Sequence, residues 1–143
     1  MALDGTGYTE MAKLKKPVTL ETIFGAYVLD EHIGGGGAGT VYGGSDSANA
    51  PIAVKVLSKE SLSTEKRRRF KNEIAFLAKC PHPNVVQIVD HGVSTDTAIP
   101  GPFYVMKRYT SSLRNVLQGL PPQNVLPIYL QLLNGIRLPR RDR

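Results

Sequence analysis

The fold is decided by Ile33-Gly34-Gly35-Gly36-Gly37-Ala38-Gly39-Thr40-Val41, which is followed by the apolar run Ile52-Ala53-Val54-Lys55-Val56-Leu57. Residues 27–33 before the glycines and residues 40–42 after them are β-type, which predicts a glycine turn between two strands. A dinucleotide-binding motif is excluded because the glycines of such a motif lead into a helix, whereas here they lead into a strand. A Walker loop is excluded because Thr40 stands at the position where that loop needs a lysine. Glycine amides carry no side chains and can approach phosphate oxygens closely, so the turn is a candidate phosphate site rather than a linker.

Lys55 stands inside the apolar strand predicted over residues 52–57, where an unpaired ammonium would be costly. A helix predicted from Ser61 or Ser63 to about Lys79 carries Glu73 at the edge of its apolar stripe. Taken alone, Lys55 fits a snorkelling surface lysine and Glu73 a solvated helix residue. Their order, their separation (73 − 55 = 18) and the nearby glycines together favour a phosphate-binding lysine with a carboxylate counter-ion.

The remaining pattern completes a small α+β domain. Prolines at 81 and 83 end the first helix, and the last third of the chain is predicted to be helical over residues 112–118 and 126–136. Residues 1–25 show little periodicity and are predicted to be an N-terminal extension, followed by a lobe over 26–110 and a helical segment with a basic tail over 111–143. Five strands are predicted in all, over residues 27–33, 40–42, 52–57, 85–89 and 103–107.

Composition narrows the functional classes. The chain has 143 residues, 41% of them hydrophobic, which is enough for one buried core. Its single cysteine, Cys80, excludes an internal disulfide framework, and no leader or membrane-spanning run is visible, so a cytoplasmic location without a membrane partner is expected.

The net charge is +6, but the last seven residues hold four arginines and Asp142, so that removing them leaves 14 basic and 11 acidic residues, or +3. A nucleic-acid partner is therefore not expected, and residues 66–69 are predicted to be a solvated helix face.

Residues 33 to about 136 resemble the N-terminal lobe, hinge and first large-lobe helices of a eukaryotic-type protein kinase. The resemblance is carried by the Gly-rich loop at 33–41, Ile52-Ala53-Val54-Lys55, Glu73, the loop at 82–86 and the strand and hinge at 104–109. It implies an α+β fold in which a five-stranded antiparallel sheet and helix C are followed by the first helices of an incomplete C-lobe.

The same resemblance implies roles for individual residues. ATP would be the ligand, with catalytic roles for Lys55, which would hold its α/β-phosphates, and for Glu73, which would hold Lys55. A longer relative would transfer the γ-phosphoryl group of ATP to Ser or Thr of a protein substrate. In the adenine site, Val41 and Ala53 would form the roof, Met106 the gatekeeper, and the Lys107 carbonyl and Tyr109 amide the hydrogen-bonding edge. The nucleotide-binding loop would comprise Ile33, Gly34, Gly35, Gly36, Gly37, Ala38, Gly39, Thr40 and Val41.

The sequence departs from this family in its catalytic groups. The His-Arg-Asp loop with its metal-binding Asn and the Asp-Phe-Gly motif do not occur in the 143 residues, and Arg141-Asp142 lacks the preceding His. Mg²⁺ is expected for the family, yet no metal ligand is assigned to this chain. The terminal residues 138–143 resemble a truncation or a reading-frame scar. The leading interpretation is a kinase-like chain that retains nucleotide positioning. One alternative is a non-catalytic nucleotide-binding or scaffold module, and another is a basic nucleic-acid-binding module, for which interleaved aromatic residues are lacking.

Overall fold

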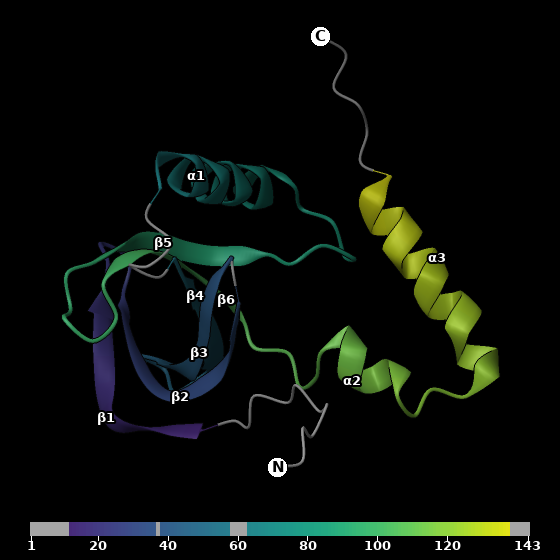
Figure 1. Ribbon diagram of the computed structural model, residues 1–143, viewed down its shortest axis with the longest axis horizontal. Coiled ribbons are helices and arrows are strands. Elements are labelled where there is room, and N and C mark those ends of the chain that lie inside the picture. Colours follow the sequence, from purple (N-terminus) through teal and green to yellow (C-terminus); the bar gives the residue numbers. More distant parts are fainter. Residues whose placement is uncertain (1–11, 37, 58–62, 138–143) are drawn as a thin grey trace, which may run out of the picture.

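The computed structural model describes residues 12–36, 38–57 and 63–137, which form a strongly curved sheet, a helix packed on it and a separate group of C-terminal helices (Figure 1). The sheet has six strands in the order β1-β2-β3-β4-β6-β5, and every neighbouring pair is antiparallel. The two edge strands, β1 and β5, approach each other, so the sheet curls into an open barrel. The strands are β1 (Ala12–Glu21), β2 (Ala26–Gly36), β3 (Gly39–Asp46), β4 (Pro51–Val56), β5 (Ile88–Ser94) and β6 (Gly101–Lys107).

Strand β1 is a correction to the sequence analysis, which predicted five strands and an aperiodic extension over residues 1–25. Its residues pair with β2, and its register shifts between Lys13 and Val18, on either side of Pro17. Only Val18 and Leu20 of this strand are buried. Lysines and a proline are typical of an edge strand, where they discourage further pairing, and they obscure the alternation by which a strand is recognised.

Alternation along the central strands divides the sheet into two faces. Ile52, Val54 and Val56 of β4 point into the barrel, where they join Phe103 and Val105 of β6 in the main core. Lys55, the residue between two of them, points to the opposite face, because successive side chains of a strand alternate. Because every second residue of these strands is buried in the core, the residues between them face outward.

Helix α1 (Thr64–Lys79) covers part of that opposite face. Its N-cap is Ser63, whose side chain accepts a hydrogen bond from the Lys66 amide, as the sequence predicts. Ser61, the other predicted cap, lies outside the described residues. Phe70 is the buried residue of the helix, and it packs with Leu57 and Tyr104 in a second, smaller core. The outer face of α1 is basic and exposed.

A buried carboxylate holds the two edges of the sheet together. Asp90 of β5 is 5% exposed and accepts hydrogen bonds from the Thr22 hydroxyl and, at 2.7 Å, from the Tyr27 hydroxyl. Thr22 lies in the turn between β1 and β2, so this Asp90 clamp joins the first hairpin to the last strand of the sheet order. Strand β5 also begins later than the predicted 85–89, since the Val85 amide is bonded to the His82 carbonyl in a turn.

The C-terminal helices pack much less. Helix α2 (Leu113–Leu117), a 3-10 turn (Pro122–Asn124) and helix α3 (Val125–Ile136) contain no buried residue. Helix α3 approaches the loop between α1 and β5 at Gly135, where an added Cβ would meet the Asn84 backbone oxygen at 2.8 Å. Among the described helices, none has the length and apolar character needed to cross a bilayer. Several apolar side chains of α3 are exposed, namely Val125, Leu126, Tyr129, Leu130, Leu132, Leu133 and Ile136.

Candidate functional site

Strand register places the predicted site residues in two neighbouring rows on the outward face of the sheet. The first, the lysine row, runs across four strands as Gly34, Val41, Lys55 and Tyr104. The second, the alanine row, lies two residues away along β3, β4 and β6 and three residues away along β2, and it runs Glu31, Gly43, Ala53 and Met106. Directly paired residues of antiparallel strands present their side chains on one face, about 5 Å apart. The structure therefore brings together Val41, Ala53, Lys55 and Met106, the residues that the family resemblance assigns to one site.

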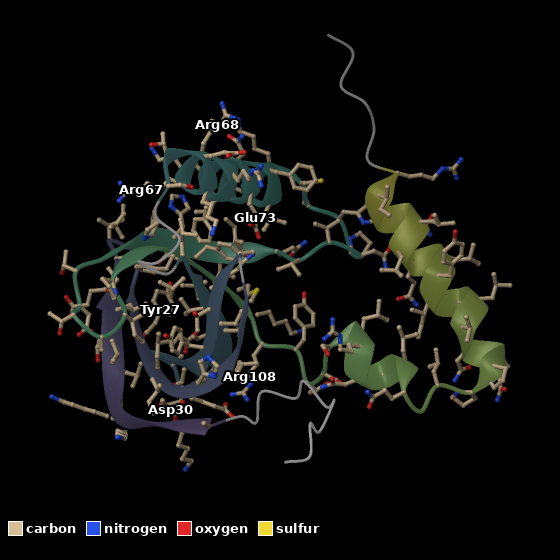
Figure 2. All side chains as sticks on the ribbon, viewed as in Figure 1. Tyr27, Asp30, Arg67, Arg68, Glu73 and Arg108 are labelled. Atoms are coloured by element: carbon tan, nitrogen blue, oxygen red, sulfur yellow. The ribbon has the colours of Figure 1, made fainter. Side chains whose placement is uncertain are left out.

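Lys55 forms the ion pair that the sequence predicts. Its Nζ lies 2.7 Å from Glu73 Oε1, and the two side chains are 18% and 36% exposed. Figure 2 shows Glu73 on the side of α1 that faces the sheet. The helix thus supplies the carboxylate that makes a half-buried lysine tolerable in this strand.

Tyr104 is a third member of this cluster, and the sequence analysis placed it only as a strand residue. Its hydroxyl donates to the same Glu73 Oε1 at 2.8 Å, and its ring centre lies 5.8 Å from Lys55 Nζ. The ring also packs against that of Phe70, with 5.5 Å between the centres. Burial, followed by the hydrogen bond to Glu73, raises the pKa of Tyr104, so the phenol remains a hydrogen-bond donor well into the alkaline range. The signal that could have found it is its position directly opposite Lys55.

The glycine-rich segment forms the predicted hairpin, with Gly36 paired to Gly39. Gly39 has φ +125° and its Cβ would meet the Val56 oxygen at 2.5 Å, so the backbone itself demands glycine there. At Gly34 and Gly36 a Cβ would meet nothing within 4 Å. Packing therefore does not account for these two glycines, whose surroundings are open. Gly37 lies outside the described residues.

The other residues assigned to the hairpin lie along its two strands. Gly35 pairs with Thr40, Ala38 is exposed at the tip, and Ile33 is half-buried on β2 beside the alanine row. These positions are compatible with a loop that covers a ligand, but they hold no charged group. Chemistry at this end of the site therefore depends on backbone amides and on Lys55.

The predicted hinge follows β6. Lys107 ends that strand opposite Ile52, and Tyr109 is exposed two residues later. Between them, Arg108 turns back to β2, where its Nη2 lies 2.6 Å from Glu31 Oε2. Sequence reasoning missed this ion pair, since nothing in the pattern of either segment links residues 31 and 108.

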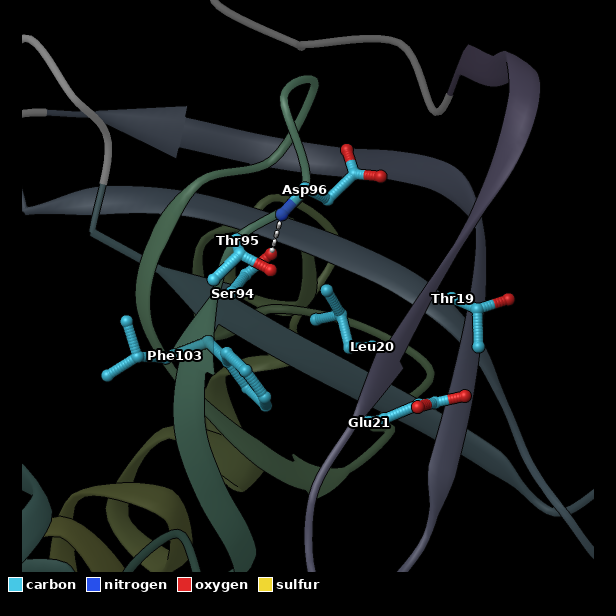
Figure 3. Close-up of a pocket in the computed structure, with 8 residues that line it drawn as sticks. Thr19, Leu20, Glu21, Ser94, Thr95, Asp96 and Phe103 are labelled. Carbon is cyan, nitrogen blue, oxygen red and sulfur yellow. Dashed lines mark hydrogen bonds between the residues drawn. The ribbon is translucent and has the colours of Figure 1, made fainter.

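Side chains that could ligate a metal ion do not cluster in the part of the chain that the structure describes. No group of three or more His, Cys, Asp or Glu side chains there could hold a metal ion. A cavity of about 410 Å³ lies elsewhere, between β1 and the end of β5, and contains none of the predicted site residues (Figure 3). Its lining consists of Thr19, Leu20, Glu21, Val93, Ser94, Thr95, Asp96 and Phe103.

Comparison with known proteins gives the class to which this fold and site belong. A family model of the protein kinase domain matches residues 27–138. The chain therefore belongs to the eukaryotic-type protein kinase family, and the antiparallel sheet, α1 and the following helices correspond to a kinase N-lobe and the start of a C-lobe.

Individual relatives are serine/threonine kinases of plants and bacteria. The chain is 38% identical over 84 residues to the probable serine/threonine-protein kinase PBL8 of Arabidopsis thaliana, a match that covers 54% of this chain and 20% of that protein. It is 37% identical over 108 residues to the serine/threonine-protein kinase pkn2 of Myxococcus xanthus, covering 73% of this chain and 13% of that protein. The chain thus spans a small part of the length of these relatives.

Proposed function

We propose that this chain binds ATP between the glycine hairpin and the outward face of the sheet. The observation that carries the proposal is the half-buried ammonium of Lys55, fixed by Glu73 in the row that begins at Gly34. The open surroundings of Gly34 and Gly36 support it, because glycines that packing does not require leave room for phosphate oxygens to reach backbone amides.

In this proposal the site has a phosphate end and an adenine end. Lys55 contacts the α/β-phosphates, while Glu73 and Tyr104 hold its ammonium in place. Val41 and Ala53 cover the adenine, and backbone groups of the segment 107–109 bond its edge. In a complete kinase, bound Mg²⁺ would supply positive charge that offsets the charge of the phosphates, but the described residues include no cluster of side chains that could hold it.

Phosphoryl transfer by the longer relatives is directed at Ser or Thr, and we extend that substrate class to any complete kinase of which these residues form part. The 143 residues themselves contain neither the His-Arg-Asp loop nor the Asp-Phe-Gly motif. Transfer requires the metal ligands and the catalytic carboxylate that these motifs supply. Purified as it stands, the chain is expected to bind nucleotide without measurable kinase activity.

Titration of the chain with ATP tests the proposal. Lys55→Met removes the cation at the phosphate end and is expected to weaken ATP binding by about tenfold or more, since a hydrogen bond to a charged group contributes about 1.5–3 kcal/mol. Glu73→Gln should weaken binding less, because the cation remains and only its orientation suffers. Lys71→Met is the matched control, as Lys71 lies exposed on the same helix. Equal affinity in wild type and Lys55→Met would remove Lys55 from the site.

A further inference from the structure

A second partly buried ion pair lies at the other end of the outward face. Arg108 and Glu31, whose charged atoms are 2.6 Å apart, have side chains that are 29% and 19% exposed. Glu31 belongs to β2, the strand that leads into the glycine hairpin, and Arg108 lies inside the predicted hinge. Figure 2 labels Arg108 well away from Glu73 under α1. The pair therefore joins the two segments that would enclose the adenine.

A glycine makes room for this ion pair. A Cβ at Gly43 would lie 2.9 Å from Arg108 Nη1, 2.9 Å from Glu31 Oε2 and 3.1 Å from Ile33 Cδ1. Gly43 lies in the alanine row between Glu31 and Ala53, the residue predicted to cover the adenine. Its φ is outside the left-handed region, so what glycine provides here is space rather than backbone freedom. The two charged side chains thus lie across the sheet directly beside the adenine end of the site.

We propose that Glu31 and Arg108 are a positioning pair that fixes strand β2 against the hinge and so sets the adenine-binding space. The inference rests on the proposed ATP site and adds to it a control of its adenine end. Neither residue needs to touch the ligand. Strand β2 carries one wall of the site and the hinge carries its hydrogen-bonding edge, so a pair that fixes their separation acts on any ligand held between them.

This role separates the two ion pairs by the ligands they affect. Lys55 lies in the lysine row and serves phosphates, so Lys55→Met should weaken ATP binding and leave adenosine binding unchanged. The Glu31–Arg108 pair lies at the adenine end, so breaking it should weaken adenosine and ATP binding by the same factor. We expect a loss of about two- to fivefold for Glu31→Gln or Arg108→Gln, the range that an ion pair of modest strength allows.

Two further variants distinguish positioning from simple structural support. The charge-swapped double variant Glu31→Arg, Arg108→Glu should recover most of the lost affinity, because the bridge is restored with its sign reversed. Gly43→Ala should weaken the binding of both ligands without changing either charge, because its methyl group would occupy the space that the Glu31 and Arg108 side chains fill. Glu65→Gln is the matched control, because Glu65 forms an exposed ion pair with Arg69 on α1, outside the site.

The experiment is an NMR titration of the labelled 143-residue chain with adenosine and with ATP, with thermal melting of each variant beside it. Equal losses for both ligands, rescue by the swap and melting temperatures that do not track affinity would support the positioning role. Unchanged affinities in Glu31→Gln, Arg108→Gln and Gly43→Ala would overturn it, as would a loss confined to ATP, which would make Arg108 a phosphate ligand. A swap that fails to rescue a folded protein would also overturn it. If wild type binds neither ligand, the proposed ATP site fails and this inference fails with it.

Discussion

The sheet region and the C-terminal helices are both strongly patterned in sequence, yet only one of them is packed. Between residues 12 and 107 the side chains of Leu29, Val54, Phe103 and Val105 are fully buried. Between residues 113 and 136 no residue is buried, although α3 is more apolar than α1, the other long helix. An amphipathic pattern shows that a face can be covered, but not that the covering surface belongs to the same 143 residues. The sheet region is therefore expected to carry the stability of the chain.

The largest expected effect tests that division directly. Phe103→Ala should lower the free energy of unfolding by about 3–5 kcal/mol, because it removes a ring that is 0% exposed at the centre of the barrel. Leu133→Ala, a change of comparable kind in α3, should cost less than about 0.5 kcal/mol. Urea unfolding followed by circular dichroism would measure both. Similar losses for the two variants would show that α3 is packed as tightly as the sheet.

A smaller effect comes from alkali, which should weaken the sheet region in particular. Burial, with help from Asp90, raises the pKa of Tyr27 to about 12, and burial also raises the pKa values of Tyr42 and Tyr104. A phenol whose pKa is higher in the folded state stabilises the fold fully below the unfolded value of about 10. That stabilisation is lost as the pH rises from about 10 towards 12, since the unfolded chain then gives up its proton first.

Melting temperatures between pH 8 and pH 12 would show this loss, and tyrosinate absorbance would report the titration. Tyr27→Phe should reduce the slope of stability against pH above about pH 10, because the variant has one fewer phenol to ionise. A slope identical to that of wild type would mean that Tyr27 ionises as readily in the folded chain as in the unfolded one.

The smallest expected effect concerns the place where the two regions meet. On an isolated helix, Gly135→Ala would stabilise α3 by about 1 kcal/mol. Here the new Cβ would meet the Asn84 backbone oxygen at 2.8 Å, so we expect a net loss of less than about 1 kcal/mol and faster hydrogen exchange in α3. Asn134→Ala on the exposed side provides the propensity control. A gain in stability from Gly135→Ala would mean that α3 does not rest on this loop.

Sequence reasoning succeeded where local chemistry is unusual. A lysine inside an apolar strand and a glutamate on the edge of a helix stripe predicted the Lys55–Glu73 pair once their order, their spacing and the nearby glycines were taken together, and the two charged atoms lie 2.7 Å apart. The roles of these residues towards a nucleotide stay predictions. The number of strands was underestimated because Lys15, Lys16 and Pro17 give β1 the composition of a loop.

The missed contacts share a different cause. Glu31 and Arg108 are 77 residues apart (108 − 31 = 77), and each is an ordinary charged residue in its own segment. Their meeting depends on the register of β2 with β3 and on the space at Gly43, neither of which a pattern of apolar residues specifies. The role of Tyr104 was missed for the same reason, because its contacts with Lys55 and Glu73 depend on the strand register that places it opposite Lys55.

The Asp90 clamp also bears on the order in which the chain folds. Thr22 and Tyr27 bind a carboxylate that lies 68 and 63 residues further along the chain, whereas the β1–β2 hairpin that carries them is held by near neighbours. Strand β5, moreover, joins the sheet through β6, which follows it in sequence. Contacts that close such long loops form slowly, because their entropy is lost before any bond is gained. We therefore expect the hairpin to form early during synthesis and to wait, with its Tyr27 hydroxyl in water, until residues up to about 107 have emerged and the barrel can close.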